Sequence, residues 1–430
     1  MIRIVDPANF QIKREVDNGT EEQRRIVRRI LGQVKEEGDR ALFRLTERFD
    51  GAKLDSLEVK PQEIDQALEQ VDDGFVQALR EAAERIRRYH EKQKRTSWME
   101  TAEDGTILGQ LVLPLEKVGV YVPGGRAAYP SSVLMNVIPA RVAGVKEIVM
   151  VTPPREDGTV YAPTLVAAKI AGVKKIYKVG GAQAIAALAY GTESVPAVDK
   201  IVGPGNIFVA LAKQAVYGLV DIDSIAGPSE IVVIADETAN PAFVAADLLS
   251  QAEHDPMASA VLITPSPKLA SRVAEELDRQ CKRLERKEIA EASLRNHGAI
   301  CITKDLPEAF EVANQLAPEH LELLVQEPWN WLANVKHAGA VFLGPYSPEP
   351  VGDYFAGPNH VLPTNGTARF FSPLNVDHFM KKTSVISYSR EALFRDAEKV
   401  MALADAEGLG AHAASVKIRL EQKEEGEELG

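Results

Sequence analysis

The chain is 430 residues long, which corresponds to roughly two to three domains of ordinary size. Its 45% hydrophobic and 26% charged residues are typical of a globular protein, and its formal net charge of −12 comes without basic tracts, which argues against a nucleic-acid or anionic-membrane partner. The start of the chain is too polar for a secretory signal, and no apolar run approaches the ~20 residues that cross a bilayer. The two cysteines, Cys281 and Cys301, are expected to be reduced thiols, which suits a cytoplasmic enzyme.

Residues 20–95 are expected to be helical, because apolar side chains recur there at the spacing of a buried helix face. From about residue 111 the pattern changes to short Val- and Ile-rich runs that end in Gly or Pro, at 118–123, 148–153 and 176–181. Two of these runs follow the same four residues, Ala-Gly-Val-Lys, at 143–146 and 171–174. A helix that ends on a Gly and leads into a buried strand gives this pattern, and a repeat of about 28 residues suits a parallel sheet.

The later part of the chain indicates a second sheet of similar build, since residues 261–265 resemble residues 149–153. From about residue 373 the chain is more polar and is expected to be helical, with a charged and frayed stretch at 421–430. The predicted fold class is therefore α/β, with parallel sheets.

Three Gly-rich turns follow the predicted strands, at 123–126, 180–184 and 203–206. Open α/β sheets bind ligands at the carboxyl ends of their strands, and backbone N–H groups in such turns can approach a pyrophosphate closely. None of the turns has the G-x-G-x-x-G spacing. From the residues alone, a nucleotide site and tight strand–helix packing are about equally plausible.

Gln251 and His254 are candidate metal ligands, because residues three apart on a helix leave on the same face. Histidine is the commonest zinc ligand, whereas glutamine is a rarer oxygen donor. An exposed helix end before the Asp-Pro pair at 255–256 is the simpler interpretation of this spacing alone. Asp353 offers a carboxylate and His412 would complete the N/O set, and the placement of five of the eight histidines between positions 320 and 412 favours a site.

Glu319 and His320 form the second candidate group. They are adjacent and cannot share a face of a regular helix, but they can converge from a turn that follows Pro318. A carboxylate beside an imidazole supplies two proton acceptors that titrate in different ranges, which suits two successive deprotonations. An exposed Glu-His pair at a helix start is the alternative.

Residues 352–364 form the third candidate group, with the sequence G-D-Y-F-A-G-P-N-H-V-L-P-T. The segment shows neither the helical nor the strand period. Its Gly and Pro residues fix the backbone, and Asp353 and His360 are the side chains that such a backbone would position. A surface turn with a solvated Asp is the alternative.

Together these segments resemble the histidinol dehydrogenase family. The resemblance rests on residues 179–188, 203–206, 226–230, 248–256, 317–321 and 352–364, in the family's order, and it extends from about residue 20 to about residue 420. It implies a zinc-dependent, NAD-linked, four-electron oxidation of L-histidinol through L-histidinal to L-histidine, the last step of histidine biosynthesis. It also implies two incomplete Rossmann-like domains and a homodimer whose C-terminal tails cross to the partner chain.

Residue by residue, the resemblance assigns four zinc ligands, Gln251, His254, Asp353 and His412. It makes Glu319 and His320 the proton-transfer pair, in which His320 accepts a proton in both hydride transfers and Glu319 activates water between them. The substrate-contacting positions are the four zinc ligands, His320, and Ser229, His360 and Glu407. The positions that match NAD contacts are Tyr121, Gln183 and Asn206.

The implied domains follow the chain as four parts. Residues 1–20 form an N-terminal segment, and residues 21–118 with 229–372 form a first α/β domain that carries the metal and substrate site. Residues 119–228 form a second α/β domain with the NAD-binding turns, and residues 373–430 form a helical tail that crosses to the partner.

Two other function classes fit parts of this pattern. A zinc hydrolase would use the same ligands and a water-activating Glu, but it would need no nicotinamide. A non-catalytic, two-lobed small-molecule binder fits the two α/β halves, but it gives no reason for Glu319 to lie beside His320.

Overall fold

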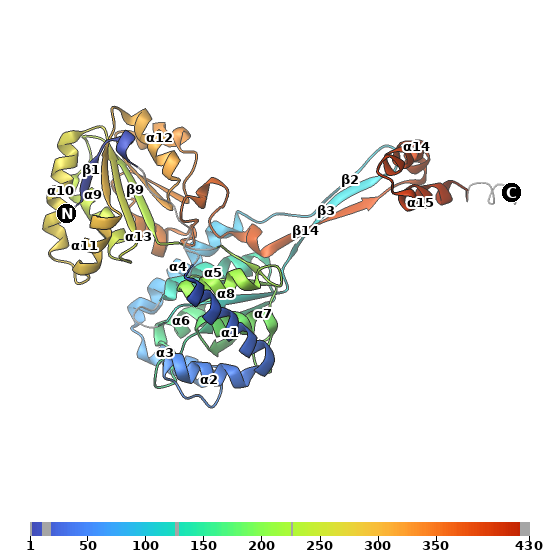
Figure 1. The fold of residues 1–430 in the computed structure, drawn as a ribbon, viewed down its shortest axis with the longest axis horizontal. Helices are drawn as coiled ribbons and strands as arrows, with labels where there is room; N and C mark the ends of the chain where they lie inside the picture. Colours follow the sequence, from blue (N-terminus) through green and yellow to red (C-terminus); the bar gives the residue numbers. More distant parts are fainter. Residues whose placement is uncertain (1, 11–18, 125–128, 225–226, 422–430) are drawn as a thin grey trace. The chain divides into compact units, whose positions relative to one another are not determined.

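The computed structural model describes residues 2–10, 19–124, 129–224 and 227–421. The chain forms two compact units (Figure 1). The main unit comprises Met1–Lys94 and Leu115–Phe379, and the tail unit comprises Arg95–Pro114 and Met380–Gly430. The main unit contains two parallel sheets, whereas the tail unit contains an antiparallel one.

The first sheet of the main unit has five parallel strands in the order β6-β5-β4-β7-β8. The strands are β4 (Lys117–Tyr121), β5 (Glu147–Thr152), β6 (Lys175–Lys178), β7 (Lys200–Val202) and β8 (Asp221–Ile222). The helices between them are α5 (Pro130–Ala143), α6 (Ala162–Ala171), α7 (Gly181–Tyr190) and α8 (Ile207–Val216). Gly144 and Gly172 end α5 and α6 in the left-handed conformation, with φ of 98° and 82°. The Gly-terminated helices and the parallel sheet predicted from the repeat are thus confirmed.

Four helices precede the first sheet and pack against its helices. They are α1 (Glu21–Glu37), α2 (Asp39–Asp50), α3 (Pro61–Gln70) and α4 (Asp73–Glu91). Apolar side chains of α1 and α2 share one core with α7 and α8, while α3 packs on α6 and α4 on α5. This packing differs from the predicted grouping of residues 21–118 with 229–372. An amphipathic pattern shows that a helix face is buried, but it does not show which sheet covers that face.

The second sheet has six parallel strands in the order β1-β11-β10-β9-β12-β13. The strands are β1 (Arg3–Val5), β9 (Glu230–Ala235), β10 (Ser259–Thr264), β11 (Ala299–Ile302), β12 (His320–Leu324) and β13 (Ala340–Leu343). The connecting helices are α9 (Pro241–Ala252), α10 (Pro267–Cys281), α11 (Lys287–Asn296) and α12 (Leu306–Leu316). Alternate side chains of these strands enter two separate cores, one on each face of the sheet.

Both sheets share one topology. Counted along the chain from β4 and from β9, the strands follow the order third, second, first, fourth, fifth, which is the order of a doubly wound nucleotide-binding fold. The second sheet adds β1 beside β11, so residues 3–5 of the expected N-terminal segment form an edge strand. The predicted pair of Rossmann-like parallel sheets is therefore confirmed.

Short helical segments complete the main unit. They are η1 (Pro7–Asn9), η2 (Pro328–Asn334), α13 (Glu349–Val351), η3 (Gly352–Ala356), η4 (Thr367–Arg369) and η5 (Val376–Phe379). Both cysteines are buried and free. Among the described residues, no helix combines the length and the apolar character needed to cross a membrane.

The tail unit contains the antiparallel sheet β14-β3-β2 and two helices. Its elements are β2 (Trp98–Thr101), β3 (Ile107–Pro114), β14 (Met380–Ser387), α14 (Arg390–Ala406) and α15 (Gly410–Glu421). The tail was predicted to be helical, but β14 is a strand that pairs with β3 along its whole length. The side chains of β14 are mostly exposed, so the strand lacks the alternation by which a half-buried strand is recognised.

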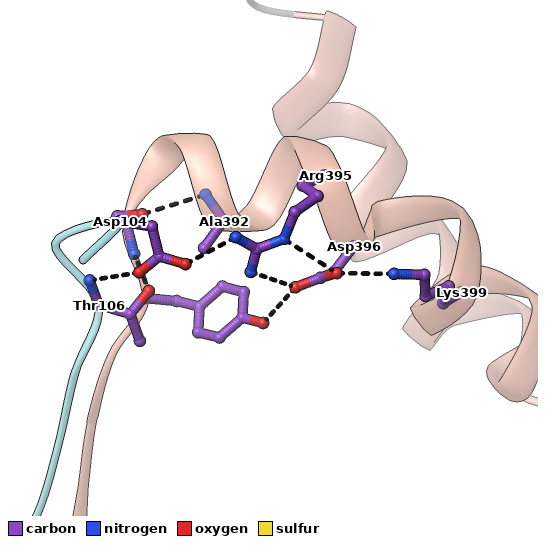
Figure 2. A network of polar contacts seen from close by, with 8 residues as sticks. Asp104, Thr106, Ala392, Arg395, Asp396 and Lys399 are labelled. Atoms are coloured by element: carbon purple, nitrogen blue, oxygen red, sulfur yellow. Dashed lines mark hydrogen bonds and ion pairs between the residues drawn. The ribbon is translucent and has the colours of Figure 1, made fainter. Parts of the chain in front are cut away.

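A polar network holds the N-terminal half of α14 against the β2–β3 hairpin (Figure 2). Arg395 Nη1 donates to Asp104 Oδ2 at 2.8 Å, and its Nη2 donates to Asp396 Oδ2 at 2.9 Å. The hydroxyl of Tyr388 donates to the same Asp396 oxygen at 2.7 Å, and Lys399 donates to the other at 3.0 Å. Charged side chains thus join α14 to the hairpin of the tail unit.

Candidate active site

The candidate catalytic residues lie at the amino edge of the second sheet. Ser229 directly precedes β9, and Glu319 directly precedes β12, whose first residue is His320. Gln251 is in the last turn of α9, and His254 lies shortly before the start of β10. Residues that are far apart in the sequence meet at this edge because the strands that follow them are neighbours, with His320 paired to Ile231.

Glu319 and His320 converge on the backbone of Glu230. Glu319 Oε2 accepts the N–H of Glu230 at 2.9 Å, and His320 Nδ1 donates to the Glu230 carbonyl at 3.1 Å. Glu319 Oε2 and His320 Nδ1 are 3.7 Å apart. Ala317 adopts a left-handed conformation at the end of α12, which turns the chain into β12. The two side chains come together from a turn, as the sequence predicted.

Burial sets the proton affinity of this pair. Glu319 is only 7% exposed, and its burial raises the pKa of its carboxyl group to about 7. Burial also opposes protonation of His320, but the neighbouring Glu319 and Asp353 carboxylates outweigh this effect and raise the pKa of His320 to about 10. Because Nδ1 donates to a carbonyl, the neutral His320 ring keeps its lone pair on Nε2. That buried atom has no hydrogen-bond partner in the part of the chain that the structure describes.

Asp353 reaches the same edge because the chain turns back along β12 after β13. The N–H of Gly344 donates to the Leu323 carbonyl at 3.0 Å, and the N–H of Glu349 donates to Glu322 Oε1 at 2.8 Å. Asp353, in η3, then places its Oδ1 atom 3.6 Å from His320 Nε2.

The ligand-type side chains at this edge fit a divalent cation. Ligand atoms of His320, Glu349 and Asp353 all lie within 4.8 Å of one another. Gln251 is 1% exposed, and neither its Oε1 nor its Nε2 atom has a hydrogen-bond partner among the described residues. Leaving a buried amide unsatisfied costs about 1–3 kcal/mol, so its carbonyl oxygen suits a ligand such as a metal ion.

His254 belongs to the same electrostatic group. Although His254 is an exposed residue, the surrounding protein desolvates the imidazole and lowers its pKa, with Asp353 opposing that effect and His320 reinforcing it. A lowered pKa keeps the imidazole neutral near pH 7, and the neutral form is the one that binds metals.

Glu349 is a site residue that sequence reasoning missed. It is 2% exposed, and its Oε2 atom accepts from the Ser250 hydroxyl at 3.2 Å. Burial raises the pKa of Glu349 to about 8 and that of neighbouring Glu322 to about 9. Glu349 lies between two prolines in a short irregular segment, and no spacing or periodicity marked it as buried.

His360 lies in the same loop as Asp353. Its Nδ1 donates to the Asp353 carbonyl at 3.0 Å, so the neutral ring keeps its lone pair on Nε2. Burial lowers the pKa of His360, so its ring is neutral near pH 7. Ser229 is half-buried at the start of β9, and it completes the group of candidate substrate contacts on the main unit.

The three positions that match NAD contacts lie at the carboxyl edge of the first sheet. Tyr121 ends β4, and its hydroxyl accepts the N–H of Gly181 at 3.2 Å. Gln183 is buried in the first turn of α7. Asn206 caps α8, where its Oδ1 accepts from the N–H groups of Phe208 and Val209.

Close packing links these turns to one another. Gly203 has φ of +113°, and a Cβ at this position would lie 2.0 Å from the Tyr121 carbonyl oxygen. Parts of the predicted motifs, at positions 125–126 and 226, lie outside the described residues, as does the charged stretch from 422 to 430.

Glu407 and His412 belong to the tail unit. Glu407 follows α14 and His412 is near the start of α15, and both side chains are exposed. Their assignment to the site stays a prediction.

The fold and the site define a two-lobed α/β protein in which a buried Glu-His pair lies beside side chains that could hold a metal ion. Residues 13–420 match the sequence model of the histidinol dehydrogenase family. The chain is 63% identical to the histidinol dehydrogenase of Halalkalibacterium halodurans over 96% of this chain and 98% of that protein, and 59% identical to that of Bacillus subtilis over 95% and 96%. A crystal structure of histidinol dehydrogenase from Elizabethkingia anophelis superposes with a TM-score of 0.89 at 38% identity, covering 98% of this chain and 95% of that one.

The chain therefore belongs to the histidinol dehydrogenase family, which makes it an oxidoreductase of histidine biosynthesis.

Proposed function

We propose that this chain catalyses the zinc-dependent, NAD-linked, four-electron oxidation of L-histidinol through L-histidinal to L-histidine. The observation that carries the proposal is the geometry at Glu230, which holds Glu319 and His320 side by side and leaves His320 Nε2 buried, without a hydrogen-bond partner among the described residues. One base then accepts the proton of an alcohol, and a second base with a pKa near 7 activates water. Both are needed to convert an alcohol into an acid. The family supports a cytoplasmic location, which we include in the proposal.

Zinc would be held by Gln251, His254, Asp353 and His412. When bound, it supplies a redox-inactive Lewis acid that fixes the substrate's imidazole and amine. Glu349 lies close enough to Asp353 and His320 to orient them. A cation beside Asp353 would also offset the carboxylate that raises the pKa of His320, and it would thereby favour the neutral ring that a base requires.

His320 would act in both oxidation steps. In the first step its Nε2 accepts the hydroxyl proton while the carbinol carbon loses a hydride to NAD, which gives the aldehyde and NADH. Glu319 then takes a proton from water as the oxygen adds to the aldehyde carbonyl. The protonated His320 returns its proton to the carbonyl oxygen, which gives the hydrate and restores the neutral ring. In the second step His320 again accepts a hydroxyl proton as the hydrate loses a hydride to a second NAD. We expect each base to contribute roughly 10²–10⁴-fold in rate.

The remaining assignments orient the substrate and the cofactor. Glu407 would hold the substrate's ammonium or imidazole by a charged hydrogen bond, and Ser229 and His360 would contact its other polar groups. Tyr121, Gln183 and Asn206 would contact NAD. Because Asn206 Oδ1 already accepts two backbone N–H groups, its amide N–H₂ group is the part that remains available for cofactor oxygens.

A homodimer with shared sites is part of the proposal. The three-stranded sheet of the tail unit leaves large apolar side chains exposed, including Trp98 at 52%, Met99 at 58% and Ile386 at 73%. Exposed apolar groups gathered on one small unit suit burial against a partner. In a dimer with crossed tails, Glu407 and His412 of one chain would complete the site of the other.

One assay tests the proposed reaction. Purified protein is given histidinol and NAD, and NADH and histidine are both quantified. The proposal predicts two NADH for each histidine. One NADH with release of aldehyde would show a simple alcohol dehydrogenase, and turnover without NADH would favour a hydrolase.

A further inference from the structure

Asn359 forms a hydrogen bond between the segment that carries His360 and helix α5 of the first sheet. Asn359 is 4% exposed, and its Nδ2 donates to the backbone carbonyl of Met135 at 2.7 Å. Met135 is in α5, which follows the first strand of the first sheet, whereas His360 belongs to the candidate site of the second sheet. This hydrogen bond is buried at both ends.

The sequence of α5 explains why that carbonyl is available. In a regular helix the N–H of residue 139 would bond to the carbonyl of residue 135. Residue 139 is a proline inside α5, so it has no N–H to give. A buried carbonyl needs a donor, and the amide of Asn359 provides it. Pro139 therefore creates the acceptor that Asn359 binds.

Both ends of the Asn359 amide are engaged, so the side chain has a single orientation. Its Oδ1 accepts the N–H of Val361 at 2.9 Å, and its Nδ2 also lies 3.5 Å from Nε2 of the fully buried His90. His360 lies between Asn359 and Val361 and is thus bracketed by these bonds. From His360 the connection continues to the backbone of Asp353, through the bond from Nδ1.

We propose that Asn359 is a positioning residue for the reaction. This inference rests on the proposed function. By binding the carbonyl that Pro139 leaves without a helical donor, Asn359 fixes the His360 ring relative to the cofactor lobe. Asn359 touches no reacting atom; it acts through His360. A small displacement of a substrate-orienting group costs far more in rate than in stability.

The first test replaces Asn359 by leucine, which keeps much of the volume and removes the donor. We expect kcat/KM for histidinol to fall about 10- to 100-fold, with zinc content and the KM for NAD unchanged. Asn136→Leu is the matched control: Asn136 is also buried in α5, but its amide bonds within that helix, to the Ser132 carbonyl at 2.7 Å. The control is expected to lower the thermal midpoint without changing kcat/KM.

A double-mutant cycle separates positioning from general destabilisation. If Asn359 acts through His360, then Asn359→Leu in a His360→Ala background should cost no more than about twofold. The same loss in both backgrounds would overturn the proposal, as would a loss in wild type no larger than that of the Asn136 control.

Pro139→Ala keeps the proposal testable if Asn359→Leu does not fold. The alanine restores an N–H that draws the Met135 carbonyl back toward the helix axis, and it should raise helix stability while lowering kcat/KM several-fold. An unchanged kcat/KM in this variant would overturn the proposal. Wild-type protein that does not oxidise histidinol with NAD would contradict the proposed function instead, before any variant is compared.

Discussion

In the first sheet, the candidate ligand-binding residues Tyr121 and Asn206 lie at the carboxyl ends of their strands. In the second sheet, which has the same strand order, Ser229 and Glu319 precede the amino ends. Under the proposed function, the usual rule that open α/β sheets bind ligands outside the carboxyl ends would describe only one of the two lobes. The same topology offers two different surfaces, and the proposed sites use one of each.

The charge of the helix ends explains why each edge suits its ligand. Helices begin at the carboxyl edge, where free N–H groups and the positive end of the helix dipole favour anions such as a pyrophosphate. Helices end at the amino edge, where the negative end of the dipole favours cations. Gln251 and His254 are at the C-terminal end of α9, so the second sheet offers a cation the better electrostatic environment. A cofactor with phosphates and a divalent metal would thus bind at opposite edges.

Loss of zinc is the largest expected effect. Chelation should abolish turnover while the circular dichroism spectrum is retained, because the site lies on sheets with cores of their own. Asp353→Ala should leave far less than one zinc per chain by atomic absorption. Asp236→Ala is the matched control, since Asp236 is a buried carboxylate directly after β9, at the opposite edge of the same sheet. If Asp236→Ala lost its zinc and Asp353→Ala kept it, the metal site would have to be assigned to the opposite edge of the sheet.

Glu319→Gln should lower histidinal oxidation by about 10²–10⁴-fold. A base works in its ionised form, and burial raises the pKa of Glu319 to about 7. The wild-type rate with histidinal should therefore rise as the pH increases through about 7. The rate of the variant should not show this rise. The measurement is NADH formation from histidinal between pH 6 and 9. A normal rate in the variant would remove Glu319 from the hydration step.

Gly203→Ala should raise the KM for NAD about tenfold or more. Its Cβ would collide with the Tyr121 carbonyl, and φ of +113° is strained for alanine. Gly218→Ala provides the control, because Gly218 also has positive φ, at +99°, but has open space around the new Cβ. Zinc content should be normal in both variants. Equal KM values for NAD in the two variants would show that the Gly203 turn does not take part in cofactor binding.

Mixed dimers test whether the amino-edge site is completed by a second chain. His320→Ala and His412→Ala should each be inactive alone. If the tails cross, a mixed dimer has one site with both lesions and one intact site. Random pairing makes half of the dimers mixed, so co-expression should restore about a quarter of normal activity. Verified mixed dimers that stay at the level of the single variants would place each tail in its own chain's site.

The sequence predicted the first lobe better than the second for physical reasons. The glycines at 144 and 172 marked helix ends, and the short Val- and Ile-rich runs after them predicted buried strands, so the first sheet and its turns followed. The convergence of Glu319 and His320 was one of two interpretations of their adjacency, since adjacent residues cannot share a helix face but can meet at a turn after Pro318. Glu349 could not be predicted, because its burial depends on a chain reversal along β12 that leaves no periodic signal.

Two features of the packing could not be obtained from local patterns. The pattern in α1 shows an apolar face but not the sheet that covers it. In β14, exposed side chains on both faces hide the strand. Each of these outcomes depends on tertiary contacts between distant segments.

The central claim is that NAD binds at the carboxyl edge of the first sheet and that the catalytic residues lie at the amino edge of the second. Its most direct test is calorimetric titration of NAD into the His320→Asn variant. His320 lies at the amino edge of the second sheet, whereas Tyr121, Gln183 and Asn206 lie at the carboxyl edge of the first. The account predicts that the variant binds NAD with the wild-type Kd although its turnover has fallen at least about 100-fold. A loss of NAD affinity in proportion to the loss of turnover would contradict it.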